Sequence, residues 1–152
     1  THNSPMFIIL YPRRWKVNAG VACEILIVDD QAGVRRLLCE AFSEQGFCVE
    51  TASNGAEAIR KTSTMTPLLI LLDIKMPGMS GLETLGELLR LNPEIQVVMM
   101  TAYGELDVMV EAKKRGVKHY INKPFDLDEV RYLVKGLLME EKDRRRRVKE
   151  TG

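Results

Sequence analysis

The sequence lacks the features that would mark a disulfide-rich or zinc-binding protein. It has only three cysteines among 152 residues, Cys23, Cys39 and Cys48. They form no CxxC pair, and no histidine lies at a spacing typical of a shared zinc site. Reduced thiols are the simpler interpretation of an odd and scattered set, so we expect a cytoplasmic protein.

Long hydrophobic runs and an excess of one charge are also missing. No segment approaches the roughly 20 apolar residues that a membrane-spanning helix needs. The early stretch MFIILYPRRWKV places its apolar residues before its basic pair, the reverse of a signal peptide. With 22 basic and 21 acidic residues the net charge is +1, which favours neither nucleic acid nor a membrane as a partner. We expect a monomer or weak dimer.

What is present is a single alternating pattern within one domain. Short apolar runs at residues 24–28, 48–52, 68–73, 95–101 and 118–122 are typical of buried strands. Apolar residues at helical spacing follow each run, and the pairs Asn54/Glu57, Ser80/Glu83 and Asp126/Glu129 predict three of the helix starts. The pattern predicts an α/β fold with a doubly wound, five-stranded parallel sheet of order 2-1-3-4-5, flavodoxin-like, in three α/β/α layers.

The domain does not account for both ends of the chain. We interpret residues 1–22 as an extension that is disordered or that arises from the choice of start site. Residues 23–140 form the domain, and the charged tail at residues 141–152 continues the last helix. Acidic residues lie on both sides of its arginine run, and no aromatic residues lie between the charges. The tail is therefore typical of a solvated helix face.

Acidic residues stand at the ends of two strands that are neighbours in this topology. Asp29 and Asp30 end the first strand, and Asp73 ends the third. Ligands of such folds bind at this point, outside the carboxyl ends of the strands. Any one of these aspartates is explained as a helix cap, but three together repel one another and need a counter-ion. The sequence therefore predicts a Mg²⁺ site, which Mn²⁺ or Ca²⁺ could also occupy.

Two further strand ends reach the same edge. The fourth strand ends at Thr101, and the fifth leads into Lys123. Alone, each is an ordinary strand-end hydroxyl or surface cation. Beside a metal, however, a hydroxyl and an ammonium are the groups that phosphoryl oxygens need.

The stretches ILIVDD, LLDIKMPGMSG, VVMMTA and YINKPF resemble the receiver domains of two-component response regulators, over roughly residues 24–140. The resemblance implies that Asp73 accepts a phosphoryl group from the phosphohistidine of a histidine kinase. It also implies that Asp30, Asp73 and the backbone carbonyl of Lys75 hold Mg²⁺, with Asp29 acting directly or through water.

The same resemblance assigns roles to the other strand ends. Thr101 and Lys123 are implied to contact the phosphoryl oxygens. Tyr120 occupies the position of the family's switch aromatic, whose rotamer follows Thr101. The Lys123–Pro124 bond is expected to be cis, which is inexpensive only before proline.

A narrower likeness concerns DDQAGVRRLL, TAYGELD and KPFDLDEVR, which resemble the single-domain regulators of sporulation phosphorelays in endospore-forming bacteria. Those regulators pass the phosphoryl group on to a second histidine protein. The likeness implies a docking face for a histidine phosphotransferase, made by Gln31, Gly33, Val34, Leu37, Tyr103, Pro124 and Phe125. For Val34 and Leu37 the alternative is core packing.

Other functions remain to be compared. A haloacid-dehalogenase-type phosphatase needs a second aspartate two residues after the first, where this chain has Lys75. An NTPase needs a phosphate-binding G-x-x-x-x-G-K-[ST] loop, which the sequence lacks. Two alternatives stay open: a chemotaxis-like module that binds a partner when phosphorylated, and the receiver of a longer DNA-binding regulator.

Overall fold

Five parallel strands form one sheet in the order β2-β1-β3-β4-β5, which confirms the predicted fold. The computed structural model describes residues 23–102 and 105–151, so the predicted extension at residues 1–22 and the docking residue Tyr103 lie outside the described residues. Every strand ends where the sequence predicts and begins one residue later. The strands are β1 (Ile25–Val28), β2 (Val49–Ala52), β3 (Leu69–Asp73), β4 (Gln96–Thr101) and β5 (His119–Asn122).

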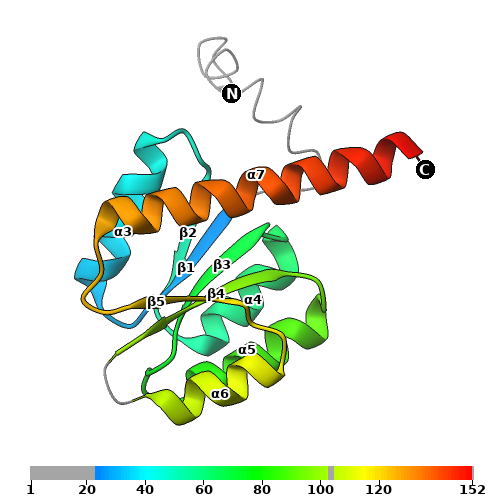
Figure 1. Cartoon of the computed structure of the whole chain (residues 1–152). Coiled ribbons are helices and arrows are strands. Elements are labelled where there is room, and N and C mark those ends of the chain that lie inside the picture. The colour runs from blue at the N-terminus through cyan, green and yellow to red at the C-terminus, as the bar shows by residue number, and fades with distance from the viewer. Residues whose placement is uncertain (1–22, 103–104, 152) are drawn as a thin grey trace, which may run out of the picture.

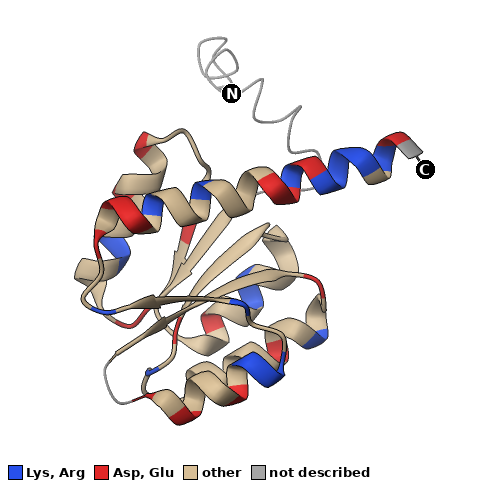
Figure 2. Ribbon diagram, viewed as in Figure 1, with Lys and Arg blue, Asp and Glu red and all other residues tan. Residues whose placement is uncertain are grey.

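Helices cover both faces of the sheet, so the molecule has three layers (Figure 1). One face carries α3 (Ala32–Glu44) and α7 (Leu127–Thr151); the other carries α4 (Gly55–Met65), α5 (Gly81–Leu91) and α6 (Leu106–Lys114). Figure 2 shows the charged residues mainly on helices and loops. No helix among the described residues is long and apolar enough to span a membrane.

The central strand β3 explains why the sheet is buried on both sides. Leu69 and Leu71 pack with the α3 and α7 side of the core, whereas Ile70 and Leu72 pack with the α4, α5 and α6 side. All four are fully buried. Alternate residues of a strand point to opposite faces, so an unbroken apolar run is what a two-sided core requires. Each such side chain contributes about 1.5–3 kcal/mol of burial free energy.

The strand register brings the carboxyl ends of four strands to one edge. Val28 pairs with Leu72 across β1 and β3, and Asp73 pairs with Met100 across β3 and β4. Thr101 pairs with Asn122 across β4 and β5. Polar residues that follow these strands must therefore lie close together.

Side-chain caps fix the starts of α4 and α5. Ser80 and Glu83 form a reciprocal capping box at α5. At α4, Asn54 accepts the backbone N–H of Glu57, but the Glu57 carboxylate accepts the N–H of Ser53 instead of that of Asn54. Both helices thus begin where the sequence predicts, with a small change of partner at α4.

Helix α7 begins beside the carboxyl edge of the sheet and crosses to the amino edge. Asp126 accepts the backbone N–H of Asp128 at its start. Apolar residues at helical spacing form a stripe that packs against the sheet, made by Val130, Leu133, Val134, Leu137 and Leu138. The charged tail is part of this helix, which runs without a break to Thr151.

Ion pairs hold the far part of α7 at the amino edge. Lys142 pairs with the buried Glu24 and lies over the ring of Phe47, 5.7 Å from its centroid. One turn is tied internally, because Glu141 accepts from Arg144 at 2.6 Å and from Arg145 at 2.8 Å.

Candidate functional site

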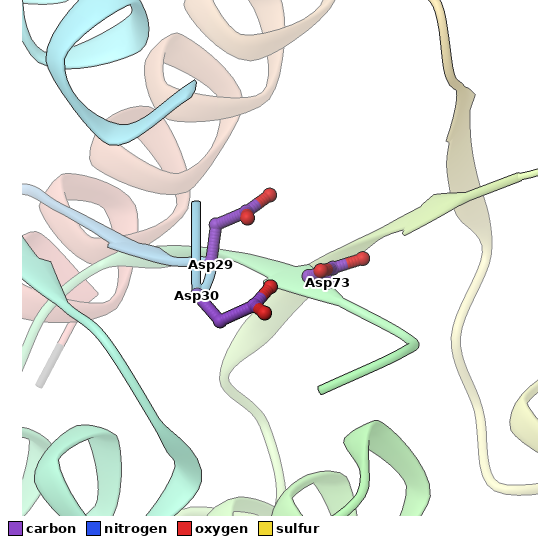
Figure 3. Close-up of side chains that lie close together, drawn as sticks. All are labelled: Asp29, Asp30 and Asp73. Carbon is purple, nitrogen blue, oxygen red and sulfur yellow. The ribbon is translucent and has the colours of Figure 1, made fainter. Parts of the chain in front are cut away.

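The three predicted aspartates meet at the carboxyl edge of the sheet. Asp29 and Asp30 follow β1, and Asp73 is the last residue of β3 (Figure 3). One carboxylate oxygen from each lies within 4.8 Å of the others. Asp29 and Asp73 are buried, while Asp30 is exposed. The arrangement is the switch-point cluster that the sequence predicts.

Asp29 is held firmly on both of its carboxylate oxygens. The backbone N–H of Gln31 donates to Oδ1 at 2.9 Å, and Lys123 Nζ donates to Oδ2 at 2.7 Å. Its backbone carbonyl also accepts from the Arg35 guanidinium at 2.8 Å. These bonds fix the orientation of the carboxylate and stabilise its charge.

Asp73 is much less well compensated. Lys123 Nζ lies 3.4 Å from its Oδ1, and the Lys75 N–H donates to the same oxygen at a long 3.4 Å. Burial and the nearby charge of Asp29 raise the pKa of Asp73 to about 6, against the opposing effect of Lys123. Asp73, the predicted phosphoryl acceptor, is therefore the buried aspartate of the cluster whose negative charge is less well neutralised.

Lys123 bridges the two buried aspartates from the end of β5. Burial lowers the pKa of its ammonium, but the hydrogen bond to Asp29 and the charges of Asp73 and Asp29 outweigh burial and raise it. Its backbone N–H donates to the Thr101 carbonyl at 2.6 Å, which ties the ends of β4 and β5 together. The Lys123–Pro124 peptide bond is cis, as predicted.

The hydroxyls of Thr101 and Tyr120 both have partners away from Asp73. Buried Thr101 donates to the Asn122 side chain at 3.0 Å and makes a longer contact of 3.5 Å with the Ile121 carbonyl. The Tyr120 hydroxyl donates to the carbonyls of Val117 at 3.1 Å and Met109 at 3.3 Å, and burial raises its pKa.

A cavity of about 510 Å³ opens over the cluster. It is lined by Asp30, Gln31, Asp73, Lys75, Met76, Pro77, Ala102, Glu105 and Lys123. The loop after Asp73 needs glycine at two positions. Gly78 has φ +76°, and a Cβ at Gly81 would lie 2.7 Å from the Asp73 carbonyl oxygen. The glycines allow α5 to start directly beside Asp73.

The predicted docking residues differ in exposure, and Gln31 lines this cavity. Gln31, Gly33 and Pro124 are exposed, and Leu37 is 43% exposed although it is a leucine on a helix. Val34 and Phe125 are half-buried and pack against the α3 and α7 side of the core, as the core-packing alternative for Val34 expects.

Three residues of the site were not predicted from the sequence. Asn122 holds the Thr101 hydroxyl, Arg35 holds the Asp29 carbonyl, and Glu105 lines the cavity while accepting the Ala102 N–H at 2.6 Å. The position of Asn122 beside Lys123 was a usable signal, since both lie at the same strand end. Arg35 and Glu105 have no comparable signature, because their contacts depend on how α3 and α6 are placed.

The donor set fits a hard divalent cation. Three carboxylates within reach of one point, two of them buried, are oxygen ligands of the kind that Mg²⁺ binds together with water. A cation there would also remove the repulsion that raises the pKa of Asp73.

Comparisons with known proteins agree with this geometry. The chain is 46% identical over 115 residues to sporulation initiation phosphotransferase F of Bacillus subtilis, covering 76% of this chain and 93% of that protein. It is 43% identical over 114 residues to regulatory protein AtoC of Escherichia coli, covering 75% of this chain but only 25% of that protein. The crystal structure of the receiver domain of NtrX from Brucella abortus matches with a TM-score of 0.72 and 32% identity, covering 76% of this chain and 98% of that one.

The family model of the response regulator receiver domain matches residues 25–135, which span all five strands and the first turns of α7. Receiver domains accept phosphoryl groups in two-component signalling, interact with histidine kinases or phosphotransferases, and generally use Mg²⁺ at an acidic site. The chain belongs to the response regulator receiver domain family.

Proposed function

We propose that Asp73 accepts a phosphoryl group from the phosphohistidine of a histidine kinase and that the protein passes it on to a histidine phosphotransferase. The observation that carries the proposal is the state of Asp73. It is buried, crowded by Asp29, and has a pKa raised to about 6, yet it opens into a cavity of about 510 Å³. Perturbed groups that face a cavity mark reactive sites more often than structural ones.

In the transfer step, an oxygen of Asp73 attacks the phosphorus in line with the bond to the histidine nitrogen. The O–P bond forms as the N–P bond breaks, and the electron pair of that bond stays on the imidazole nitrogen. The product is an acyl phosphate on Asp73. Phosphoryl transfer of this kind depends mainly on positioning and charge neutralisation.

The metal is assigned to Asp29, Asp30, Asp73 and the backbone carbonyl of Lys75. When bound, Mg²⁺ neutralises charge between the carboxylates and the phosphoryl oxygens. The close approach of the three carboxylates supports the assignment of the aspartates.

Lys123 and Thr101 supply the remaining contacts to the phosphoryl oxygens. Lys123 already lies 3.4 Å from Asp73 and needs little movement. The Thr101 hydroxyl must exchange Asn122 for a phosphoryl oxygen. We propose that Tyr120 responds to this exchange, because its hydroxyl ties β5 to Met109 within α6 and to Val117 in the segment after it.

Two observations favour a relay of the sporulation type. The similarity to sporulation initiation phosphotransferase F extends over 93% of that protein. Gln31 is exposed and lines the cavity over Asp73. Gly33 and Leu37 on α3 and Pro124 after β5 are also exposed, which leaves them free to contact a docked histidine domain. We place the reaction in the cytoplasm, because the described residues contain no disulfide.

The alternative is a receiver that acts through a bound partner or through further domains. The match to regulatory protein AtoC covers only a quarter of that protein, so a receiver of this kind also occurs within longer regulators. Following the label after the phosphorylated protein is mixed with a histidine phosphotransferase separates these functions. Rapid onward transfer supports the relay, whereas retention together with a stable complex supports the alternative.

The central test replaces Asp73 by Asn. Labelling by a phosphorylated histidine kinase should disappear, while the variant keeps its fold by circular dichroism. The control is Asp107→Asn, which alters an exposed acid on α6 and should be labelled like the wild type. Undiminished labelling of the folded Asp73→Asn protein would exclude Asp73 as the acceptor.

A further inference from the structure

Glu105 makes a contact at the cavity that the proposed function leaves unexplained. Its carboxylate accepts the backbone N–H of Ala102 at 2.6 Å. Ala102 follows Thr101 at the end of β4, and Glu105 immediately precedes α6. A short hydrogen bond to a carboxylate is stronger than one between neutral groups.

Both partners of this contact border the cavity over Asp73. Ala102 and Glu105 line it together with Asp73 and Lys123. The Ala102 amide therefore lies at the edge of the space that an acyl phosphate on Asp73 would enter, and it already binds an anionic oxygen. Backbone N–H groups of this kind are good ligands for phosphoryl oxygens.

Glu105 and a phosphoryl group compete in two ways. One N–H cannot serve the carboxylate and a phosphoryl oxygen equally well. The phosphoryl group also brings further negative charge into a cavity that already holds Asp30, Asp73 and Glu105 against Lys75 and Lys123. Repulsion thus favours departure of the Glu105 side chain, which unlike Asp73 is not fixed at a strand end.

The contact has the i/i+3 spacing of one half of a capping box, like that between the Ser80 N–H and the Glu83 carboxylate, but Ala102 has no side-chain oxygen to make the reciprocal half. At α5, the paired Ser80 and Glu83 make a reciprocal capping box. At α6, Glu105 has φ −106° and ψ 34°, outside the usual cap conformation, and its own side chain does not cap the helix. A purely structural role also predicts that loss of the Glu105 carboxylate lowers stability without changing the affinity for a phosphoryl anion.

We propose that Glu105 is a positioning residue that occupies the Ala102 amide until a phosphoryl oxygen on Asp73 replaces it. The inference rests on the proposed function. The carboxylate opposes phosphorylation, and its displacement releases the contact that holds the start of α6 to the end of β4. Phosphorylation of Asp73 thereby changes how the start of α6 is held against the sheet.

The test measures binding of beryllium fluoride, a phosphoryl mimic, in excess Mg²⁺. The variants are Glu105→Ala, which removes the acceptor, and Glu105→Gln, which keeps an acceptor oxygen but removes the charge. Asp107→Asn is the matched control, because it removes an exposed acid from the first turn of the same helix. The dissociation constant should fall about tenfold for Glu105→Ala and about threefold for Glu105→Gln. It should stay within about twofold for the control.

A spectroscopic measurement separates displacement from a general loss of structure. The Ala102 amide proton should resonate differently in the wild type and in Glu105→Ala with Mg²⁺ alone. With beryllium fluoride bound, the two proteins should give the same shift, since the same fluoride ligand then occupies the amide. Unchanged or weaker binding by both Glu105 variants, or Ala102 shifts that differ in the bound state, would overturn the inference. If even the wild type fails to bind, the proposed function fails as well.

Discussion

Two acids at opposite edges of the sheet show how the same side-chain chemistry serves two purposes. Glu141, at the amino edge, is buried, and its pKa is lowered; burial acts to raise it, but Arg144 and Arg145 outweigh burial. Asp73, at the carboxyl edge, is also buried, but its pKa is raised to about 6 by burial and by Asp29.

The lysines at the two edges differ in the number of buried acids that each one neutralises. Lys142 serves a single buried acid, Glu24, which also accepts the N–H of Cys48. Lys123 is shared between Asp29 and Asp73. A protein that only needed stability would pair each buried charge, as the amino edge does. The carboxyl edge leaves negative charge over, which favours the binding of a cation.

Removing each lysine gives the largest expected contrast between the edges. Lys123→Met should lower the free energy of unfolding by about 3 kcal/mol in a chelator, because two buried carboxylates lose their cation. Lys142→Met should cost about 1 kcal/mol, since the Lys142 side chain is 39% exposed. Urea denaturation measures both. Phosphorylation by acetyl phosphate should be severely reduced only in Lys123→Met, and an equal reduction in Lys142→Met would contradict the division of roles.

Removing each acid should change stability in opposite directions. Without metal, Asp73→Asn should raise the free energy of unfolding by about 2 kcal/mol, because it removes a buried charge whose pKa is raised to about 6. Glu141→Gln should lower it by about 1–2 kcal/mol, since two arginines lose their partner. Thermal unfolding in a chelator compares the two variants. Destabilisation by Asp73→Asn would mean that the carboxylate is better compensated than its surroundings indicate.

The two acids also predict different effects of pH. Asp73 has a folded pKa above its ordinary value of 3.8, so the folded state takes up a proton as pH falls through about 6. The stability advantage of Asp73→Asn should therefore shrink between pH 7.5 and pH 5. Glu141 has a folded pKa below 4.5, so its contribution persists above pH 4.5 and is lost as pH falls further. Denaturation curves of the variants across this range test both signs.

Substitution of two exposed leucines, one near each edge, should give the smallest difference between the edges. Leu37 lies on α3, near the carboxyl edge, and Leu91 ends α5, near the amino edge; they are 43% and 39% exposed. Leu37→Ala should slow transfer to a histidine phosphotransferase about fivefold to tenfold, since exposed anchors of an interface contribute about 1 kcal/mol or more. Leu91→Ala should leave transfer unchanged, and neither should alter phosphorylation by acetyl phosphate. Equal effects would remove the case for docking at α3.

The sequence predicted the strand ends and the three-aspartate cluster because both follow from short-range patterns combined with one topological rule. Asp29, Asp30 and Asp73 had to meet once β1 and β3 were neighbours. Asn122 was signalled by its position beside Lys123, but its hydrogen bond to the Thr101 hydroxyl depends on side-chain rotamers. The bond between Glu105 and the Ala102 N–H could not be predicted, since it depends on the placement of α6. The ties of Lys142 to Glu24 and Phe47 join residues more than 90 positions apart, and no local pattern signals them.

The most direct test of the central claim is to locate the acyl phosphate chemically. Borohydride reduces an aspartyl phosphate to homoserine, which peptide mass spectrometry identifies by position. After phosphorylation in Mg²⁺ we expect homoserine at residue 73, and none when the metal is chelated. Homoserine at residue 29 or 30 in place of 73, or equal labelling without a divalent cation, would contradict the central claim.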